Sequence, residues 1–218
     1  VEEGRLQLTD PVSKHLPQLA KREVGVEKFD ATTGKAVFYT VPAEREMTIQ
    51  NLLRHTSGLT YAIFGRSAVK SLYQQAGVGR QDETNADLVE KLGKLPLAYQ
   101  PGTTWEYSHS TDVLGRLVEV VSGMPLDQFF QERIYTPLGM KDTFFWPAAD
   151  RKERLAVTYK KDKDALARSG EWLGGESAGK YPLPAGGLWS TGPDFAKLYD
   201  MLLAGGQAGG RRYLKDST

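Results

Sequence analysis

Residues 101–123 read PGTTWEYSHSTDVLGRLVEVVSG, and this stretch decides how the middle of the chain folds. It opens with a Pro-Gly turn, and Ser110 or Thr111 is suited to cap a helix whose first turn carries Asp112. A one-sided row of apolar residues follows, formed by Val113, Leu114, Leu117, Val118 and Val121. Gly123 is typical of the position just after a helix. The sequence therefore predicts a turn, a short extended segment and an amphipathic helix.

Tyr107 lies on the segment that leads into this helix. A phenol on an exposed loop near the partly positive end of a helix is a candidate for proton transfer. A tyrosine between a strand and a loop is also commonly a half-buried packing residue. The local pattern leaves both roles open.

Further signals predict a mixture of strands and helices along the chain. Expected strands cover residues 35–41 and 155–160, and expected helices cover 48–53, 88–92, 126–134 and 193–202. Capping boxes are expected at Thr84 and Thr191, and Pro137 is expected to stop the helix that begins at residue 126. Residues 61–79 combine aromatic residues with glycines, which is typical of a flap beside a pocket.

The composition excludes several classes of function. The chain has 218 residues, 40% of them hydrophobic and 25% charged, which is ordinary for a globular protein. Its net charge of +1 gives no field that would attract nucleic acid. No apolar run approaches the roughly 20 residues of a membrane span. We therefore expect neither a nucleic-acid partner nor a membrane-spanning segment.

Cofactor sites are not expected either. The chain has no cysteine, which excludes disulfides and thiolate chemistry. Its three histidines, His15, His55 and His109, are well separated and form no metal-binding motif. Neither a Gly-x-Gly-x-x-Gly fingerprint nor a Walker loop is present.

Several sequence blocks follow one another in an order typical of a known superfamily. They are VEEGRLQLTDPVSKHLP at residues 1–17, LLRHTSGL at 52–59, YSHSTDVLG at 107–115, PLGMKDT at 137–143 and PAGGLWST at 184–191. With these blocks the chain resembles the serine β-lactamase and penicillin-recognising superfamily. It is most similar to the class C β-lactamase-like esterases, also called family VIII carboxylesterases. The resemblance implies an α/β fold, with an antiparallel sheet flanked by helices and a mostly helical region, in which residues 1–218 belong to one catalytic domain.

The resemblance also implies a chemistry. This superfamily acylates a serine carried in Ser-x-x-Lys, and the tyrosine of its second motif relays a proton. Tyr107 matches that tyrosine. The Ser-x-x-Lys segment is expected upstream of Val1, and the strand with the third motif is expected beyond Thr218.

Two Ser-x-x-Lys matches occur inside the chain, at Ser67 and Ser177. Both come after the HTSGL block, whereas the family places its nucleophile before residue 1. The surroundings of Ser67 indicate an exposed flap rather than the start of a buried helix, and those of Ser177 indicate a glycine-rich loop. Neither serine is expected to be the nucleophile.

Three further residues are expected to bind substrate, two of them, His109 and Gly186, on the basis of the resemblance. His109 stands where β-lactamases carry the Asn of Tyr-x-Asn, which favours an esterase. Gly186 falls where class C β-lactamases carry a tyrosine in the pocket wall, so a wider pocket is implied. Tyr61 is expected to line the pocket, whereas Trp189 has either a lining or a packing role. The implied function is a cofactor-free serine hydrolase for small esters of short to medium acyl chains.

Other functions stay open at this stage. A β-lactamase, a D-alanyl-D-alanine peptidase, an acyltransferase and a non-catalytic ligand-binding member would share the same blocks. A Ser–His–Asp triad built from Ser108 or Ser110, His109 and Asp112 is not expected, because triads are assembled from separate segments. The sequence leaves the oligomeric state open, and the compartment open between cytoplasm and periplasm.

Overall fold

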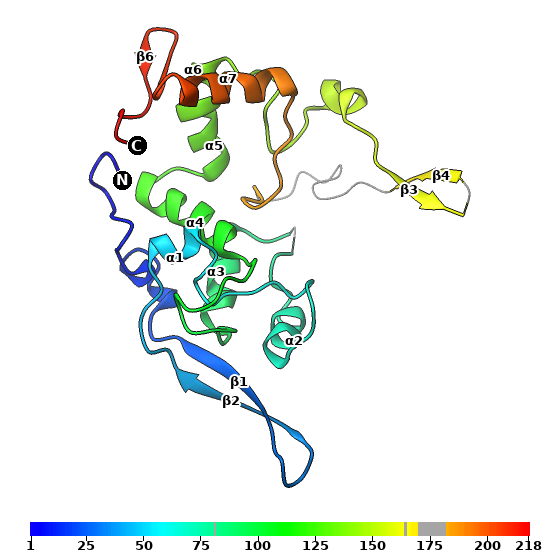
Figure 1. The fold of residues 1–218 in the computed structure, drawn as a ribbon. Coiled ribbons are helices and arrows are strands. Elements are labelled where there is room, and N and C mark those ends of the chain that lie inside the picture. Colours follow the sequence, from blue (N-terminus) through cyan, green and yellow to red (C-terminus); the bar gives the residue numbers. More distant parts are fainter. Residues whose placement is uncertain (81, 164, 170–181) are drawn as a thin grey trace. The chain divides into compact units, whose positions relative to one another are not determined.

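The computed structural model describes residues 1–80, 82–163, 165–169 and 182–218. The chain divides into two compact units, Val1–Met124 and Pro125–Thr218. Both units contain helices as well as strands, and the strands of the described residues pair in three two-stranded antiparallel sheets (Figure 1).

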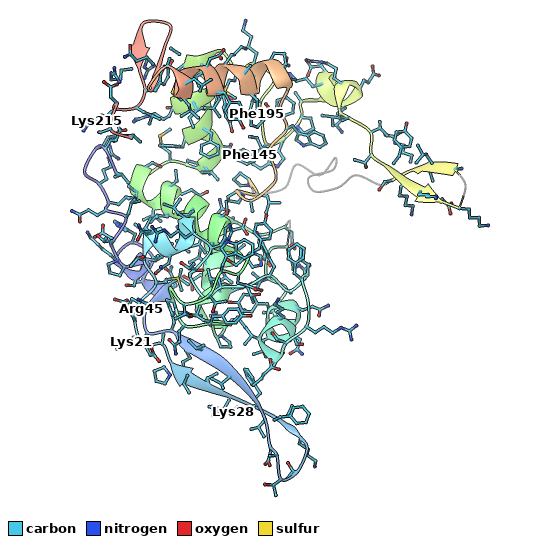
Figure 2. All side chains as sticks on the ribbon, in the orientation of Figure 1. Lys21, Lys28, Arg45, Phe145, Phe195 and Lys215 are labelled. Carbon is cyan, nitrogen blue, oxygen red and sulfur yellow. The ribbon has the colours of Figure 1, made fainter. Side chains whose placement is uncertain are left out.

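The first unit carries one hairpin and four helices. They are β1 (Glu23–Phe29), β2 (Ala36–Pro42), α1 (Ile49–Leu53), α2 (Ala68–Gln75), α3 (Asn85–Gly93) and α4 (Ser110–Ser122), preceded by the 3-10 turns Val12–Lys14 and Pro17–Leu19. The two strands pair from Glu23 with Pro42 to Phe29 with Ala36, which confirms the predicted strand at 35–41. The hairpin extends away from the helices, and Lys28 lies on it with its ammonium 5.9 Å from the Tyr39 ring centroid (Figure 2).

The core of the first unit lies where α1 and α3 pack against α4. Its fully buried side chains include Leu52, Leu88, Leu92, Val113 and Leu117. Each such aliphatic side chain contributes about 1.5–3 kcal/mol relative to an exposed one. The buried Arg22 donates to the Leu92 carbonyl at 2.7 Å and also to the carbonyls of Gly93 and Leu95. Its positive charge therefore caps the carboxyl end of α3.

Helix caps were predicted for three of the helices in this unit, α1, α3 and α4, and two of these predictions are correct. Thr48 and Thr84 form the capping boxes of α1 and α3. The prediction that Ser110 or Thr111 caps α4 is wrong: His109 occupies the cap position, without a side-chain cap bond. The reason is that the Ser110 hydroxyl bonds to Ser57 and Ser108 instead of the helix backbone. Gly123 ends α4 with φ +73°, as expected.

Residues 61–79 differ from the expected flap because they contain α2. The four-residue spacing of Val69 and Tyr73 places both on one helix face, where both are buried. Val69 packs against Gly25 of β1 so closely that a Cβ at Gly25 would lie 2.4 Å from the Val69 Cγ2. Ser67, expected to lie outside a helix start, is the N-cap of α2.

In its described part, the second unit contains short helices and two further hairpins. Its elements are α5 (Leu126–Phe130), a π turn (Gln131–Tyr135), α6 (Thr136–Leu138), the 3-10 helix Ala149–Arg154, β3 (Tyr159–Asp162), β4 (Ala165–Arg168), α7 (Gly192–Leu203), β5 (Gln207–Ala208) and β6 (Arg211–Arg212).

Two boundaries in the second unit were predicted wrongly. Pro137 does not stop the helix, because it lies in the first turn of α6, where its missing N–H is tolerated. The helical run ends at Gly139 with φ +66°. The strand expected from residue 155 begins at Tyr159, because the pairing with β4 spans only four residues.

Two of the sequence blocks meet in the core of this unit. The Asp194 carboxylate on α7 accepts from the Asp142 N–H at 2.7 Å and from the Thr143 hydroxyl at 2.9 Å. Phe144 and Trp189 exchange both backbone hydrogen bonds, at 3.0 and 2.8 Å. Phe145 stacks on Phe130 at 5.9 Å and is buried (Figure 2). The PLGMKDT block and the residues around the glycine loop thus hold each other.

Candidate active site around Tyr107

The backbone just before Tyr107 is held in place by hydrogen bonds to the HTSGL block. The N–H of Glu106 donates to the His55 carbonyl at 2.9 Å, and that of Gly102 donates to the Thr56 carbonyl at 2.6 Å. The side chain of Tyr107 is 42% exposed. Within the described residues, its hydroxyl has no hydrogen-bond partner. The phenol is therefore rigidly mounted and accessible at the same time.

Three aromatic rings contact the ring of Tyr107, and a fourth contacts one of these three. The ring centroid of Tyr107 is 5.1 Å from that of His55, 5.2 Å from Tyr61 and 5.8 Å from Phe64. Trp105, which is 66% exposed, contacts the other side of His55 at 6.3 Å. Such tilted aromatic contacts restrict ring orientation. Tyr107 thus opens onto an aromatic surface.

Asp112 is the buried anchor of this cluster. Its Oδ2 accepts from the Tyr61 hydroxyl at 3.3 Å and lies 2.8 Å from the Nδ1 of His109. The Tyr61 and His109 rings meet edge to face at 4.3 Å. Burial, together with the negative charge of Asp112, raises the pKa of the Tyr61 phenol well above its usual range. Tyr61 therefore stays a neutral donor to Asp112.

A chain of hydroxyl groups joins the HTSGL block to the start of α4. The Nδ1 of His55 lies 3.4 Å from the Ser108 hydroxyl, which lies 2.8 Å from that of Ser110, which in turn lies 2.8 Å from that of Ser57. All three serines are fully buried. Burial lowers the pKa of the His55 imidazole, although the charge of Asp112 opposes the shift. This arrangement gives the two blocks a structural role.

The hydroxyl chain also bears on the alternative triad. The Ser108 and Ser110 hydroxyls bond to each other, and their further partners are His55 and Ser57 rather than His109. Because both serines are buried, neither is placed to attack a substrate. The geometry therefore agrees with the expectation that no triad forms from these neighbouring residues.

The serine and the lysine of the Ser-x-x-Lys match at Ser67 have structural roles. The Ser67 hydroxyl accepts from the Lys70 N–H at 3.1 Å and caps α2. The Lys70 ammonium lies 2.8 Å from the Glu106 Oε1. The hydroxyl and the ammonium thus have separate structural partners. Ser177 lies outside the described residues.

Gly186 belongs to the second unit. There it is exposed and lines a cavity of about 620 Å³. The apolar side chains of this cavity are Pro147, Leu155, Ala156, Val157, Leu188 and Trp189. Trp189 lines this cavity, which is one of the two roles that the sequence left open, and its backbone pairs with that of Phe144. Within the first unit, the expected site residue Tyr61 contacts both Tyr107 and the expected site residue His109.

Among the described residues, no group of three or more His, Cys, Asp or Glu side chains is arranged to hold a metal ion. No helix in this described portion combines the length and the apolar character that crossing a membrane requires.

Comparison with known proteins decides the family. The family model described as Beta-lactamase matches residues 1–218. The chain belongs to the β-lactamase family. Protein Rv1367c of Mycobacterium tuberculosis is 36% identical to it over 219 residues, covering 100% of this chain and 53% of that protein. Lovastatin esterase of Penicillium rubens is 35% identical over 208 residues, covering 94% of this chain and 50% of the esterase.

Solved structures give the same answer for the fold. EstCE1, described as a hydrolase with promiscuous acyltransferase activity, superimposes with a TM-score of 0.75 at 24% identity, over 99% of this chain and 56% of EstCE1. The β-lactamase-like fold of helices and antiparallel strands is therefore confirmed, as is the predicted family. The β-lactamase family chain spans about half the length of the curated relatives that it matches.

Sequence reasoning missed two features of this site. Asp112 was interpreted as a charge in the first turn of a helix, and its place in a triad was rejected, although its position three residues after His109 allows a side-chain bond. Glu106 drew no interpretation, yet it binds both Lys70 and the hydroxyl of Thr60. Neither partner of Glu106 is near it in sequence, so no local signal would have revealed them.

Proposed function

We propose that the full-length protein is a serine hydrolase that cleaves carboxylic esters of short to medium acyl chains, with Tyr107 as its proton relay. The observation that carries this proposal is that Tyr107 has an unpartnered hydroxyl on a side chain that is held in place. Its hydroxyl has no partner among the described residues, while its backbone and ring are held from several sides. A free phenol on a rigid support is suited to proton transfer.

The proposed reaction has two steps. In the first, a serine hydroxyl attacks the ester carbonyl carbon, and its proton passes through Tyr107 to the departing alkoxide, which leaves as an alcohol. In the second, water attacks the acyl-serine, and the carboxylic acid is released. The nucleophile is proposed to lie in a Ser-x-x-Lys segment upstream of Val1, and the third-motif strand beyond Thr218.

The surroundings of Tyr107 favour an ester over a β-lactam. His109 stands in place of the Asn that offers its amide to substrate in β-lactamases, and its Nδ1 is bonded to Asp112. We propose that His109 shapes the site through its contact with the Tyr61 ring. Tyr61 and Gly186 are each proposed to bind substrate. The name of lovastatin esterase supports an ester substrate.

The test is a kinetic comparison of full-length variants on p-nitrophenyl esters. Tyr107→Phe should lower turnover at least about 10²-fold, the scale of a lost proton-transfer group. Tyr99→Phe is the matched control, because Tyr99 is a similarly exposed tyrosine in the same unit and should keep the wild-type rate. An unchanged rate in Tyr107→Phe would refute the relay.

A second measurement locates the nucleophile. The full-length protein is treated with a fluorophosphonate, and the modified peptide is identified by mass spectrometry. A single adduct on a serine upstream of Val1 is expected. An adduct on Ser67 or Ser177 would overturn the assignment, and the absence of both adduct and ester turnover would favour a non-catalytic binding protein.

A further inference from the structure

The Lys70 ammonium contacts the loop of residues 61–66, which we call the aromatic loop. It donates to the Phe64 carbonyl and pairs with the Glu106 Oε1 at 2.8 Å. A Cβ placed on Gly65 would lie 3.6 Å from the Lys70 Nζ, so the ammonium touches the turn of the loop as well. The ammonium is therefore a link between the aromatic loop and the segment that carries Tyr107.

Lys70 reaches this position from a helix that is itself fixed. The N–H of Ala68 donates to the Glu27 carboxylate of β1, and Val69 packs against Gly25 of the same strand. Tyr73, one turn further along α2, is fully buried. Because α2 is held on two sides, Lys70 anchors the loop to a rigid part of the unit.

Glu106 completes the link from the other side. Its Oε1 also accepts from the Thr60 hydroxyl at 2.7 Å. Thr60 immediately precedes the aromatic loop, and Lys70 follows it on α2. One carboxylate, directly before Tyr107 in the chain, thus ties together both ends of the aromatic loop. Both members of the Lys70–Glu106 pair are largely shielded from solvent, so salt screens them less than a surface pair.

The aromatic loop presents apolar surface beside Tyr107. Ile63 is 78% exposed and Phe64 is 49% exposed, and the Phe64 ring lies 5.8 Å from that of Tyr107. Tyr61, at the start of the loop, contacts both Tyr107 and Phe64 through its ring. Large exposed apolar side chains gathered next to a candidate catalytic group indicate a surface that binds an apolar ligand.

We propose that Lys70 is a positioning residue that holds the aromatic loop in place as the apolar wall of the substrate site, and so sets a preference for esters with longer apolar acyl chains. The inference rests on the proposed function. Lys70 is the lysine of the Ser-x-x-Lys match at Ser67. Through its bonds to the Phe64 carbonyl and to Glu106 it acts in substrate selection, and it takes no part in the chemical step.

The kinetic test uses full-length Lys70→Met, Glu106→Gln and the double variant, with p-nitrophenyl acetate and p-nitrophenyl octanoate as substrates. We expect KM for the octanoate to rise about threefold to tenfold, while kcat stays within about twofold and the acetate kinetics hardly change, because only the longer chain needs the wall. Lys70→Arg should restore the wild-type KM. The double variant should be no worse than either single variant, because both remove one interaction.

Lys91→Met is the matched control. The Lys91 ammonium also pairs with a carboxylate, that of Glu83, and donates to a loop carbonyl, that of Gly77. It resembles Lys70 in chemistry but binds a different loop, so its loss should leave both KM values unchanged. Equal losses of kcat in Lys70→Met on both esters would overturn the proposal, since they would indicate a general defect or a chemical role.

A measurement independent of activity separates this proposal from the proposed function. Amide hydrogen exchange of a peptide covering residues 60–67 should speed up in Lys70→Met and Glu106→Gln, and stay unchanged in Lys91→Met. Unchanged exchange in all three variants would overturn the positioning role even in an active esterase. If the wild-type protein cleaved no ester, the proposed function would fail, and the exchange data would still decide whether Lys70 holds the loop.

Discussion

His109 and Asp112 face each other across the first turn of α4, with 2.8 Å between the His109 Nδ1 and the Asp112 Oδ2. The same oxygen accepts from the Tyr61 hydroxyl, which comes from a segment 51 residues earlier. Asp112 is only 1% exposed. A single buried carboxylate therefore fixes the orientation of the His109 ring and of the Tyr61 ring, which contacts Tyr107, and its removal tests how much the cluster depends on it.

We expect Asp112→Asn to lower the free energy of unfolding of the first unit by about 1–3 kcal/mol, because it replaces charge-assisted hydrogen bonds with weaker ones in a buried position. Urea unfolding followed by the fluorescence of Trp105, the only tryptophan in residues 1–124, measures this change. Asp82→Asn is the control, since Asp82 forms an exposed pair with Arg80 and should change stability by less than about 0.5 kcal/mol. Equal stability of the two variants would mean that Asp112 does not hold the cluster.

Tyr107→Phe should leave stability within about 0.5 kcal/mol of the wild type, because the deleted hydroxyl is half-exposed and has no partner in the described structure. The melting temperature of the variant measures this directly. Together with the loss of turnover expected above, an unchanged melting temperature would show that the hydroxyl acts in the reaction and not in the fold. A marked drop in melting temperature would instead indicate a packing role.

The parts of the fold that were predicted from sequence depend on residues three or four apart. The caps at Thr48, Thr84 and Thr191 are of this kind, because each side chain bonds to a backbone N–H three residues later. The end of α4 at Gly123 is another, because only local backbone conformation is involved.

The parts that were missed depend on partners distant in sequence. Ser110 was expected to cap α4, but its hydroxyl is taken by Ser57, which lies 53 residues away. Lys70 was considered only as half of a Ser-x-x-Lys pattern, whereas its partner Glu106 lies on the far side of α3 in the sequence. Periodicity and caps describe single elements and carry no information about which elements become neighbours. For the same reason, His109 was placed in the site by resemblance to a family and Tyr61 by the aromatic stretch that it begins, whereas Asp112, which joins them, was not placed there.

Gly58→Ala should destabilise the first unit by more than about 2 kcal/mol. Gly58 has φ +86°, and a Cβ there would lie 2.2 Å from the Tyr99 carbonyl oxygen, so backbone strain and a clash with backbone add together. Gly123→Ala is the matched control, because Gly123 has φ +73° with no atom within 4 Å of the added Cβ, and only the strain of about 1 kcal/mol applies. Thermal unfolding of both variants gives the difference. If Gly58→Ala were no worse than Gly123→Ala, the close approach of the HTSGL block to Tyr99 would be refuted.

His55 predicts how stability depends on pH. Burial lowers the pKa of its imidazole below the ordinary value of 6.5, so the folded state disfavours the protonated form. Well above pH 6.5 the imidazole is neutral in both states and adds no pH dependence to the free energy of unfolding. As the pH falls below that value, the unfolded chain binds the proton more readily than the folded chain, so the free energy of unfolding decreases until the folded pKa is passed.

The measurement compares the melting temperatures of the wild type and His55→Asn between about pH 7.5 and pH 5.5. Asparagine is the suitable replacement because His55 has φ +53°, a conformation that asparagine tolerates well. His15 and His109 are present in both proteins, so their contributions cancel in the difference. The wild type should lose more stability than the variant as the pH falls through this range. Parallel curves would mean that His55 titrates alike in the folded and unfolded chain, and that the contacts of its ring with Tyr107 and Trp105 leave it open to solvent.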